Sequence, residues 1–328
     1  MNKVLGMGNA LVDILLPLKD DLLLEVLNFP KGSMQLVDEK SAESIFLQSN
    51  IKKHEKAAGG SAANTIHALA KLGVSTGFVG KVGKDEWGDF FKEEMQTENI
   101  TPHLFSSATS SGRAITLISP DSERTFGTYL GAAVELSAED LSSEIFQNYG
   151  VFHIEGYLVQ NHALLEQALK FAKESNLKVS LDLASFNVVE DNFDFLHRMV
   201  EKYVDIIFAN EEEGKSFTKL DDENKIIEEL AKNVEVAVLK IGSRGSIIKA
   251  GNEKVAVDIY QASPVDTTGA GDLYASGFIY GYINNKSLYE SGRIGSLLSA
   301  KVIEVIGPKM TDEIWESIKR EIKNIISD

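Results

Sequence analysis

The segment Asp266-Thr267-Thr268-Gly269-Ala270-Gly271-Asp272 combines the residue types of an anion-binding turn with a carboxylate. Gly269, Ala270 and Gly271 are small and leave backbone N–H groups unobstructed where a helix begins, and the helix dipole adds partial positive charge there. Such a terminus binds phosphate. Asp272 falls in the first helical turn, where the dipole favours an ionised carboxylate that can accept a hydroxyl proton. The segment therefore predicts phosphoryl transfer to an alcohol.

A structural role is the alternative for this segment. Leu273, Gly277 and Gly281 share one face of the following helix, so a glycine-rich turn could simply cap a buried helix. That interpretation is favoured for a bare Gly-x-Gly-Asp, but the full heptapeptide favours the phosphate site.

A second glycine pair, Gly59-Gly60, precedes Ser61 and a helix whose Ala62, Ile66 and Leu69 share one face. Ser61 is predicted to be the N-cap of this helix. Asn64 adds a donor and an acceptor within the first turn, which a plain Gly-Gly turn does not require. The pattern alone is a weak indication of a small-molecule site.

Asn9 and Asp13 lie at the end of the first predicted strand, where a polar pair can hydrogen-bond the hydroxyls of a sugar. A turn-forming role is the alternative. The nearby Gly6-Met7-Gly8 lacks the third glycine of a dinucleotide fingerprint, which argues against a Rossmann dehydrogenase.

Asn210 and Glu213 begin a predicted helix at a spacing that places them together, and their oxygens suit hydrated Mg²⁺. Stabilisation of the helix N-terminus is the alternative. After the next strand, the turn from Lys240 to Gly245 offers exposed N–H groups. No Gly-x-x-x-x-Gly-Lys-Ser/Thr sequence occurs, which excludes a P-loop.

The composition restricts the partners. The 328 residues include 33 Lys and Arg against 49 Asp and Glu, and the net charge of −16 argues against nucleic acid or anionic membrane as a partner. The absence of Cys excludes disulfides and thiolate chemistry. The six His lack the i, i+4 pairing of a helical zinc site, and His153 is predicted to be a core residue. No apolar run is long enough to span a bilayer, and Asn9 and Asp13 interrupt any leader-like segment, so a cytoplasmic protein is expected.

Buried strands alternate with amphipathic helices through most of the chain. This alternation predicts an α/β fold with a doubly wound, mostly parallel sheet in one domain, residues 1–328. Strands are predicted at 77–82, 151–155, 178–183, 204–209 and 236–241, with helices at 163–175 and 224–232. Segments 12–37 and 104–130 break the alternation, and a hairpin of 113–118 and 124–129 is predicted within the second. These segments are expected to form a small β-sheet lid, or else a decorative hairpin.

Four motifs occur in this order: Gly59-Gly60-Ser61-x-x-Asn64, Asn210-x-x-Glu213, Lys240-x-Gly242-x-x-Gly245 and Asp266 to Asp272. Together they resemble the ribokinase-like (PfkB) family of carbohydrate and nucleoside kinases over essentially the whole chain. The family's fold is a doubly wound α/β body with a small β lid. Several stretches are most similar to adenosine kinases within the family, namely Gly6 to Ile14, Glu155-Gly156-Tyr157, Ser185-Phe186 and Tyr203 to Glu211.

The resemblance implies a role for each motif. Asp272 would be the catalytic base, and Gly269, Ala270 and Gly271 would hold the transferring phosphoryl group. The acceptor would be held by Asn9, Asp13, Gly59, Gly60, Ser61 and Asn64, with Phe126, Tyr157 and Phe186 around its base. Arg124, arriving from the lid, would neutralise phosphate in the closed state. ATP would lie against Asn210, Lys240, Gly242, Gly245 and Thr267. Asn210 and Glu213 would order Mg²⁺ through water, and Asp266, Thr268 and Gly307 would supply oxygens to K⁺.

The expected reaction is ATP-dependent phosphorylation of a primary hydroxyl, that of adenosine to give AMP. A sugar kinase for ribose, fructose or ketodeoxygluconate is the alternative, because Ala62-Ala63 replaces a more polar pair of animal and plant adenosine kinases. A catalytically silent nucleoside-binding protein is a third possibility that the intact base and anion site disfavour. The protein is expected to be a monomer, or a homodimer that pairs through lid strands.

Overall fold

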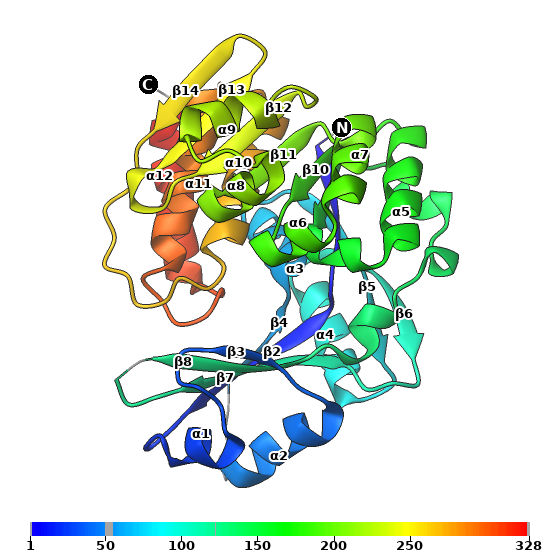
Figure 1. The fold of residues 1–328 in the computed structure, drawn as a ribbon, viewed down its shortest axis with the longest axis vertical. Coiled ribbons are helices and arrows are strands. Elements are labelled where there is room, and N and C mark those ends of the chain that lie inside the picture. Colours follow the sequence, from blue (N-terminus) through cyan, green and yellow to red (C-terminus); the bar gives the residue numbers. More distant parts are fainter. Residues whose placement is uncertain (1, 50–54, 122, 327–328) are drawn as a thin grey trace.

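The computed structural model describes residues 2–49, 55–121 and 123–326. Its main feature is a nine-stranded sheet in the order β14-β13-β12-β11-β10-β9-β1-β5-β6 (Figure 1). The strands are β1 (Lys3–Met7), β5 (Ser75–Gly83), β6 (Ile100–Ser107), β9 (Val151–Glu155), β10 (Lys178–Asp182), β11 (Ile206–Asn210), β12 (Val236–Lys240), β13 (Ser246–Ala250) and β14 (Glu253–Val257). Neighbours from β6 to β12 are parallel, and β13 and β14 add an antiparallel edge. The predicted mostly parallel α/β sheet is confirmed.

Helices cover both faces of this sheet, as the doubly wound prediction requires. One face carries α5 (His162–Glu174), α6 (Phe186–Asp191), α7 (Phe193–Tyr203), α8 (Glu211–Thr218) and α9 (Glu223–Leu230). The other carries α3 (Ser61–Lys71), α4 (Glu86–Thr97), α10 (Ala270–Ile283) and α11 (Leu288–Val302), with α12 (Asp312–Ile325) packed outside α11. The seven strands and helices predicted by range correspond to observed elements within two residues at each end.

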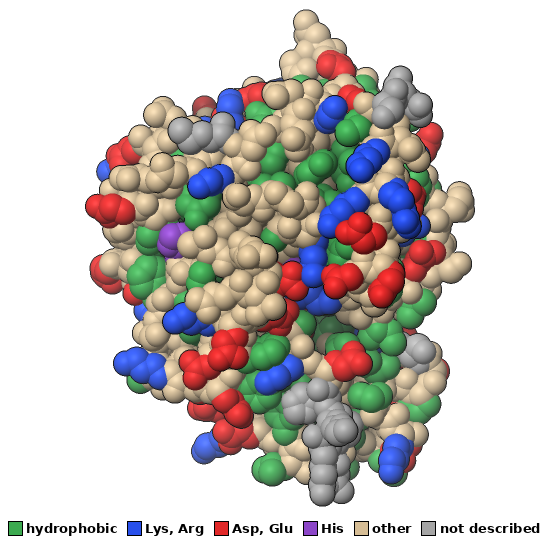
Figure 2. Space-filling model, turned by 180° about the vertical axis from the view of Figure 1, so that it is seen from behind, with side chains coloured by type: hydrophobic (Ala, Val, Ile, Leu, Met, Phe, Trp, Pro, Cys, Tyr) green, Lys and Arg blue, Asp and Glu red, His purple; other side chains and the backbone are tan. Residues whose placement is uncertain are grey.

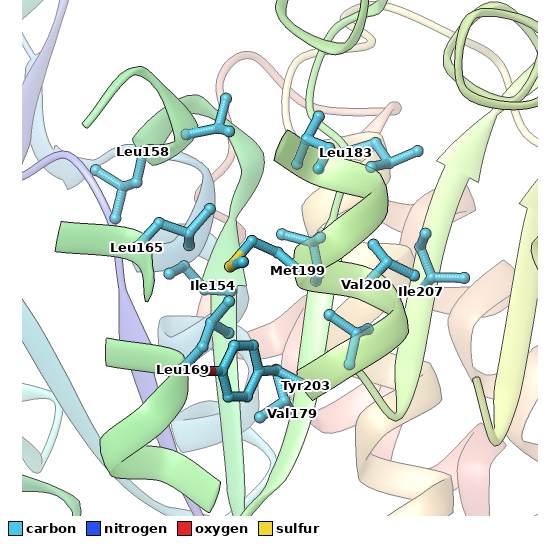
Figure 3. Packing of buried hydrophobic residues seen from close by; sticks show 14 of the residues in the cluster. Ile154, Leu158, Leu165, Leu169, Val179, Leu183, Met199, Val200, Tyr203 and Ile207 are labelled. Atoms are coloured by element: carbon cyan, nitrogen blue, oxygen red, sulfur yellow. The ribbon is translucent and has the colours of Figure 1, made fainter. Parts of the chain in front are cut away.

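The packing of α5 and α7 shows why these segments are helical (Figure 3). Leu165 and Leu169, four residues apart on α5, face Met199 and Tyr203, which have the same spacing on α7. Both pairs are buried on strands β9 to β11. Each helix thus buries one apolar stripe, which holds the strand ends beside it in place. His153 of β9 lies on the opposite face of the sheet from Phe152 and Ile154 and is also buried; burial lowers its pKa to about 4, and its predicted core position is confirmed.

A second, five-stranded sheet lies beside the first, and we call it the small sheet (Figure 1). Its order is β3-β8-β7-β2-β4, with β2 (Leu11–Pro17), β3 (Met34–Leu36), β4 (Glu55–Gly59), β7 (Gly112–Ile118) and β8 (Arg124–Tyr129). The predicted hairpin is β7 and β8. No strand is predicted from the sequence at β4, and residues 104–107 belong to β6 of the large sheet. The division into one domain with a lid stays a prediction.

Two helices cover the side of the small sheet that faces away from the large one (Figure 1). These are α1 (Leu22–Leu27) and α2 (Glu39–Ser49). Leu24, Ala42 and Ile45 of these helices are buried in the same apolar cluster as Ile14 and Ile115 of the sheet. The other side of the small sheet is left facing the strand ends of the large one.

Acidic and basic side chains are interspersed over the face in Figure 2. Within the described ranges, no helix has both the length and the apolar character needed to cross a bilayer.

Candidate active site

Four neighbouring strands of the large sheet each end on a polar or charged residue. These are Glu155 of β9, Asp182 of β10, Asn210 of β11 and Lys240 of β12. Because the strands are parallel, their carboxyl ends meet at one edge of the sheet, where ligands bind in open α/β folds. This edge faces the beginning of α10, because a Cβ atom on Gly271 would lie 3.2 Å from Lys240 Nζ.

The beginning of α10 has the backbone geometry that the predicted anion site requires. Gly269 is the N-cap, with a φ of 77° that favours glycine. The N–H of Ala270 donates to Thr267 O at 3.2 Å. In the described part of the chain, the N–H groups of Gly269, Gly271 and Asp272 have no backbone partner. The free donors therefore differ by one position from the predicted set, because the turn consumes Ala270.

Asp272 lies in the first turn of α10 and links it to α3. Its carboxylate accepts the Ser61 hydroxyl at 2.7 Å and the Asn64 amide at 3.0 Å. Burial raises the pKa of Asp272 to about 6, although these two hydrogen bonds lower it. The helix dipole favours the ionised carboxylate, as expected from the sequence, but burial acts in the opposite direction and is the largest cause of the raised pKa. A carboxylate with a pKa near neutrality is a better general base than an ordinary aspartate.

The prediction that Ser61 caps α3 is wrong. The N-cap is Gly60, and Ser61 is the first helical residue, so its hydroxyl is free to donate to Asp272. Gly60 has a φ of 102°, and a side chain there would overlap the carbonyl of Asn9. The glycine therefore brings two backbone segments together at the site.

Asp13 of β2 faces the same site from the small sheet. A side chain on Gly59 would overlap the Asp13 carboxylate, so this glycine makes room for the acid. Burial raises the pKa of Asp13 to about 7, against the lowering effect of Lys309. The two glycines and Asp13 are thus brought together as predicted.

Glu155 is a residue that the sequence interpretation missed. Its carboxylate accepts the backbone N–H and the side-chain amide of Asn9 at 2.9 and 2.8 Å, and the N–H of Ala62 at 2.9 Å. Burial raises the pKa of Glu155 to about 7. Glu155 fixes the end of β1 against the start of α3, and an acid ending a buried strand was the available signal.

A cavity of about 360 Å³ lies between these elements. Asp13, Gly60, Ser61, Asn64 and Asp272 line one part of it. The remaining predicted residues that line it are Arg124, Phe126, Tyr157, Asn210, Glu213, Lys240, Asp266, Thr268, Gly271 and Gly307. Asp182 also lines it and was not predicted. We call this the acceptor cavity.

A larger cavity of about 950 Å³ adjoins the acceptor cavity, and the two share Leu11, Gly60, Ser61, Ala114 and Tyr157. Its walls are mainly apolar and come from both sheets and their loops: Leu11, Met34, Leu36, Leu130, Ala133, Val134, Leu136, Leu158 and Val188. Asn9 opens onto it as well. Phe186, predicted to contact the acceptor, is 45% exposed and is not among the lining residues of either cavity. We call the larger cavity, of about 950 Å³, the apolar cavity.

A third cavity, of about 710 Å³, lies on the other side of the α10 terminus. It brings together the predicted nucleotide residues Asn210, Lys240, Gly242, Gly245 and Thr267. A side chain on Gly245 would overlap the carbonyl of Val257, so close backbone approach explains this glycine. We call this the donor cavity. It shares Asn210, Lys240 and Gly271 with the acceptor cavity.

Asn210 and Glu213 form a capping box at the start of α8. Glu213 accepts the backbone N–H and the side-chain amide of Asn210, each at 2.7 Å. Burial raises the pKa of Glu213 to about 7, although Lys240 lowers it. Among the described residues, no group of three or more His, Asp or Glu could hold a metal ion. A magnesium ion at Asn210 and Glu213 would therefore need phosphate and water oxygens to complete its shell.

Asp266 joins the phosphate turn to the small sheet. Its carboxylate accepts the N–H of Thr268 at 2.9 Å and of Gly307 at 2.6 Å, and pairs with Arg124 of β8. The three residues expected at K⁺ are thus adjacent. Arg124, expected to neutralise phosphate, is bound to a protein carboxylate in this structure.

Comparison with known proteins agrees with this geometry. A family model described as pfkB family carbohydrate kinase matches residues 34–314. The 5-dehydro-2-deoxygluconokinase of Geobacillus kaustophilus is 29% identical over 267 residues, which are 76% of this chain and 79% of that protein.

Two solved structures are similar along almost their whole length. A probable sugar kinase from Rhizobium etli is 33% identical, with a TM-score of 0.85 over 97% of this chain and 98% of that one. The adenosine kinase from Sinorhizobium meliloti is 32% identical, with a TM-score of 0.85 over 98% and 99%. With the family model covering most of its length, the chain belongs to the pfkB family of carbohydrate kinases.

Proposed function

We propose that this kinase transfers the γ-phosphoryl group of ATP to the 5′-hydroxyl of adenosine. One observation carries the phosphoryl transfer: the donor and acceptor cavities meet at Gly271, at the anion site, and Asp272 lies on the acceptor side of that junction. A donor phosphate and an acceptor hydroxyl placed in the two cavities would approach each other there. Positioning and electrostatic stabilisation are the main sources of rate in this chemistry.

The proposed transfer forms one bond to phosphorus and breaks another. The acceptor oxygen forms a bond to the γ-phosphorus, the bond from that phosphorus to the bridging oxygen breaks, and ADP leaves with the electron pair. Asp272 takes the hydroxyl proton. The N–H groups of Gly269 and Gly271 donate to the phosphoryl oxygens. Mg²⁺, held beside Asn210 and Glu213 through water, would neutralise charge on the ATP phosphates when bound.

The small sheet contributes to the same step. Asp13 and Asn64 would hold sugar hydroxyls, and Arg124 would exchange Asp266 for phosphate when the sheet closes as a lid. Exclusion of water by closure strengthens each of these contacts.

The apolar cavity supports a nucleoside as the acceptor. Met34 and Leu36 line it although they are 60% and 69% exposed, so a ligand there would cover apolar surface that the protein leaves in water. A nucleobase has a flat apolar face that can cover such a surface, whereas a free sugar presents hydroxyls in every direction. The 32% identity to the adenosine kinase from Sinorhizobium meliloti also supports adenosine.

A sugar kinase is the second candidate. Relatives named as sugar kinases support it, and the acceptor cavity alone is polar enough for a free sugar. In that case the apolar cavity would stay open to solvent during turnover.

A panel of acceptors with ATP separates the candidates. Adenosine, inosine, ribose, fructose and 5-dehydro-2-deoxygluconate are compared by the rate of ADP formation. We expect the highest kcat/KM for adenosine. Preference for a free sugar would overturn the nucleoside assignment, and no ADP with any acceptor would overturn the kinase assignment.

A further inference from the structure

Lys240 and Asp182 form a buried ion pair at the edge where the four strands end. The Lys240 ammonium donates to Asp182 Oδ2 at 2.9 Å. The two side chains are 16% and 8% exposed. Asn210, on the strand between theirs, separates the two strand ends. Removing an ammonium and a carboxylate from water costs free energy, so the burial of this pair indicates that its charge has a role in the site.

The ammonium lies directly against the anion site. The position of a Cβ atom on Gly271 would be 3.2 Å from Lys240 Nζ. Lys240 also lines both the acceptor and the donor cavities. A group at the γ-phosphate position would therefore lie within reach of this lysine from either side.

The surrounding charges keep Lys240 protonated. Burial lowers its pKa, but Asp182 of β10 and Glu213 of α8, with a smaller effect of Asp272 of α10, reverse this and raise the pKa above the ordinary value of 10.5. One ammonium thus faces three carboxylates when no phosphate is present. The other cation that lines the acceptor cavity, Arg124, is already paired with Asp266.

We propose that Lys240 binds the transferring phosphoryl group and that Asp182 is the positioning residue that holds its ammonium against Gly271. The proposal rests on the kinase function proposed above. An ammonium has three donors on a flexible stem, so Lys240 can keep one hydrogen bond to Asp182 while it donates another to a phosphoryl oxygen. Because Lys240 borders both cavities, its positive charge stays close to the phosphoryl group while that group passes from the donor to the acceptor.

The first test replaces the lysine. In Lys240→Met we expect turnover with ATP and the preferred acceptor to fall about 10² to 10³-fold, the loss typical of one transition-state donor. The dissociation constant of the acceptor, measured by calorimetry without ATP, should stay unchanged. Wild-type turnover in Lys240→Met would overturn the assignment.

A matched control is available within the chain. Lys81 and Asp140 form an ion pair of the same 2.9 Å length, 14% and 19% exposed, and neither residue lines the three cavities of the candidate site. Lys81→Met should lose stability but keep wild-type turnover. Equal loss of turnover in both variants would show that a buried ion pair, and not phosphate binding, is what matters. If Lys240→Met does not fold, Lys240→Arg should keep more turnover than Lys240→Gln, and equal rates would contradict the proposal.

The second test addresses Asp182. Removal of its charge in Asp182→Asn lowers the pKa of Lys240, so kcat/KM for ATP should decline at a lower alkaline pH than in the wild type. A merely structural role of Asp182 would change stability without shifting the pH at which kcat/KM for ATP declines. An unshifted decline would overturn the positioning role. A wild-type protein that forms no ADP with any acceptor would instead refute the proposed function.

Discussion

The residues of the site act through burial more than through their intrinsic acidity. Asp13, Glu155, Glu213 and Asp272 all have a raised pKa, and burial is the largest cause in each case. Carboxylates that share a site with so little water are poised to gain or lose protons near neutral pH.

The pH dependence of turnover tests this at the scale of a residue. A base must be ionised to accept a proton, so turnover should fall as the pH is lowered through about 6, where Asp272 becomes protonated. An aspartate at its ordinary pKa of 3.8 would keep turnover constant to a much lower pH. The measurement is kcat against pH with saturating ATP and acceptor. A profile that stays flat well below pH 6 would contradict the raised pKa.

At the scale of elements, the junction between β4 and α3 sets the distance between Asn9 and Asp272. Gly60→Ala should therefore lower stability by more than the ~1–2 kcal/mol of a left-handed non-glycine residue, because the added carbon overlaps Asn9 O. Gly73→Ala is the matched control, with a φ of 86° and no atom within 4 Å of the added carbon. Chemical denaturation measures both, and equal losses would refute the close approach at Gly60.

Strand β3 is expected to contribute acceptor affinity without contributing stability. Met34→Ser should raise KM for adenosine about tenfold, the usual effect of lost apolar contact in a pocket, and leave the melting temperature unchanged. Leu47→Ser is the control, because Leu47 of α2 is also exposed and lines none of the cavities described above. An unchanged KM in Met34→Ser would place the acceptor elsewhere.

The strands and helices differ in how well the sequence predicts them. The strands and helices with strong periodicity are predicted within two residues, because their apolar pattern records which face is buried. Strand β4 (Glu55–Gly59) is missed because three of its five residues, Ala57, Ala58 and Gly59, are small and carry no alternating pattern.

The site residues likewise separate into those with a local sequence pattern, which are predicted, and those without one, which are missed. Motif residues such as Asn64 and Asp272 are found from the sequence because their spacing is local. Glu155 and Asp182 are missed because their roles depend on which strands become neighbours. The raised pKa of Asp272 is missed because burial depends on the whole fold, whereas the helix dipole is a local effect.

At the scale of the whole molecule, α1 and α2 bear on assembly. They cover the face of the small sheet that would otherwise be free for a second copy of the chain (Figure 1). We therefore propose a monomer, although a pair through lid strands was the other expectation. Light scattering during gel filtration should give a mass near 36.0 kDa, and twice this mass would contradict the proposal.

In the proposed function, the two sheets of the molecule hold an acceptor against the phosphate site, and the hydroxyl proton passes to Asp272 at that junction. The most direct test is the rate of ADP formation with adenosine in Asp272→Asn, with Asp89→Asn in the first turn of α4 as control. We predict a loss of about 10² to 10⁴-fold in kcat for Asp272→Asn with almost unchanged adenosine binding, and wild-type turnover in the control. Near-normal turnover in Asp272→Asn would contradict the account.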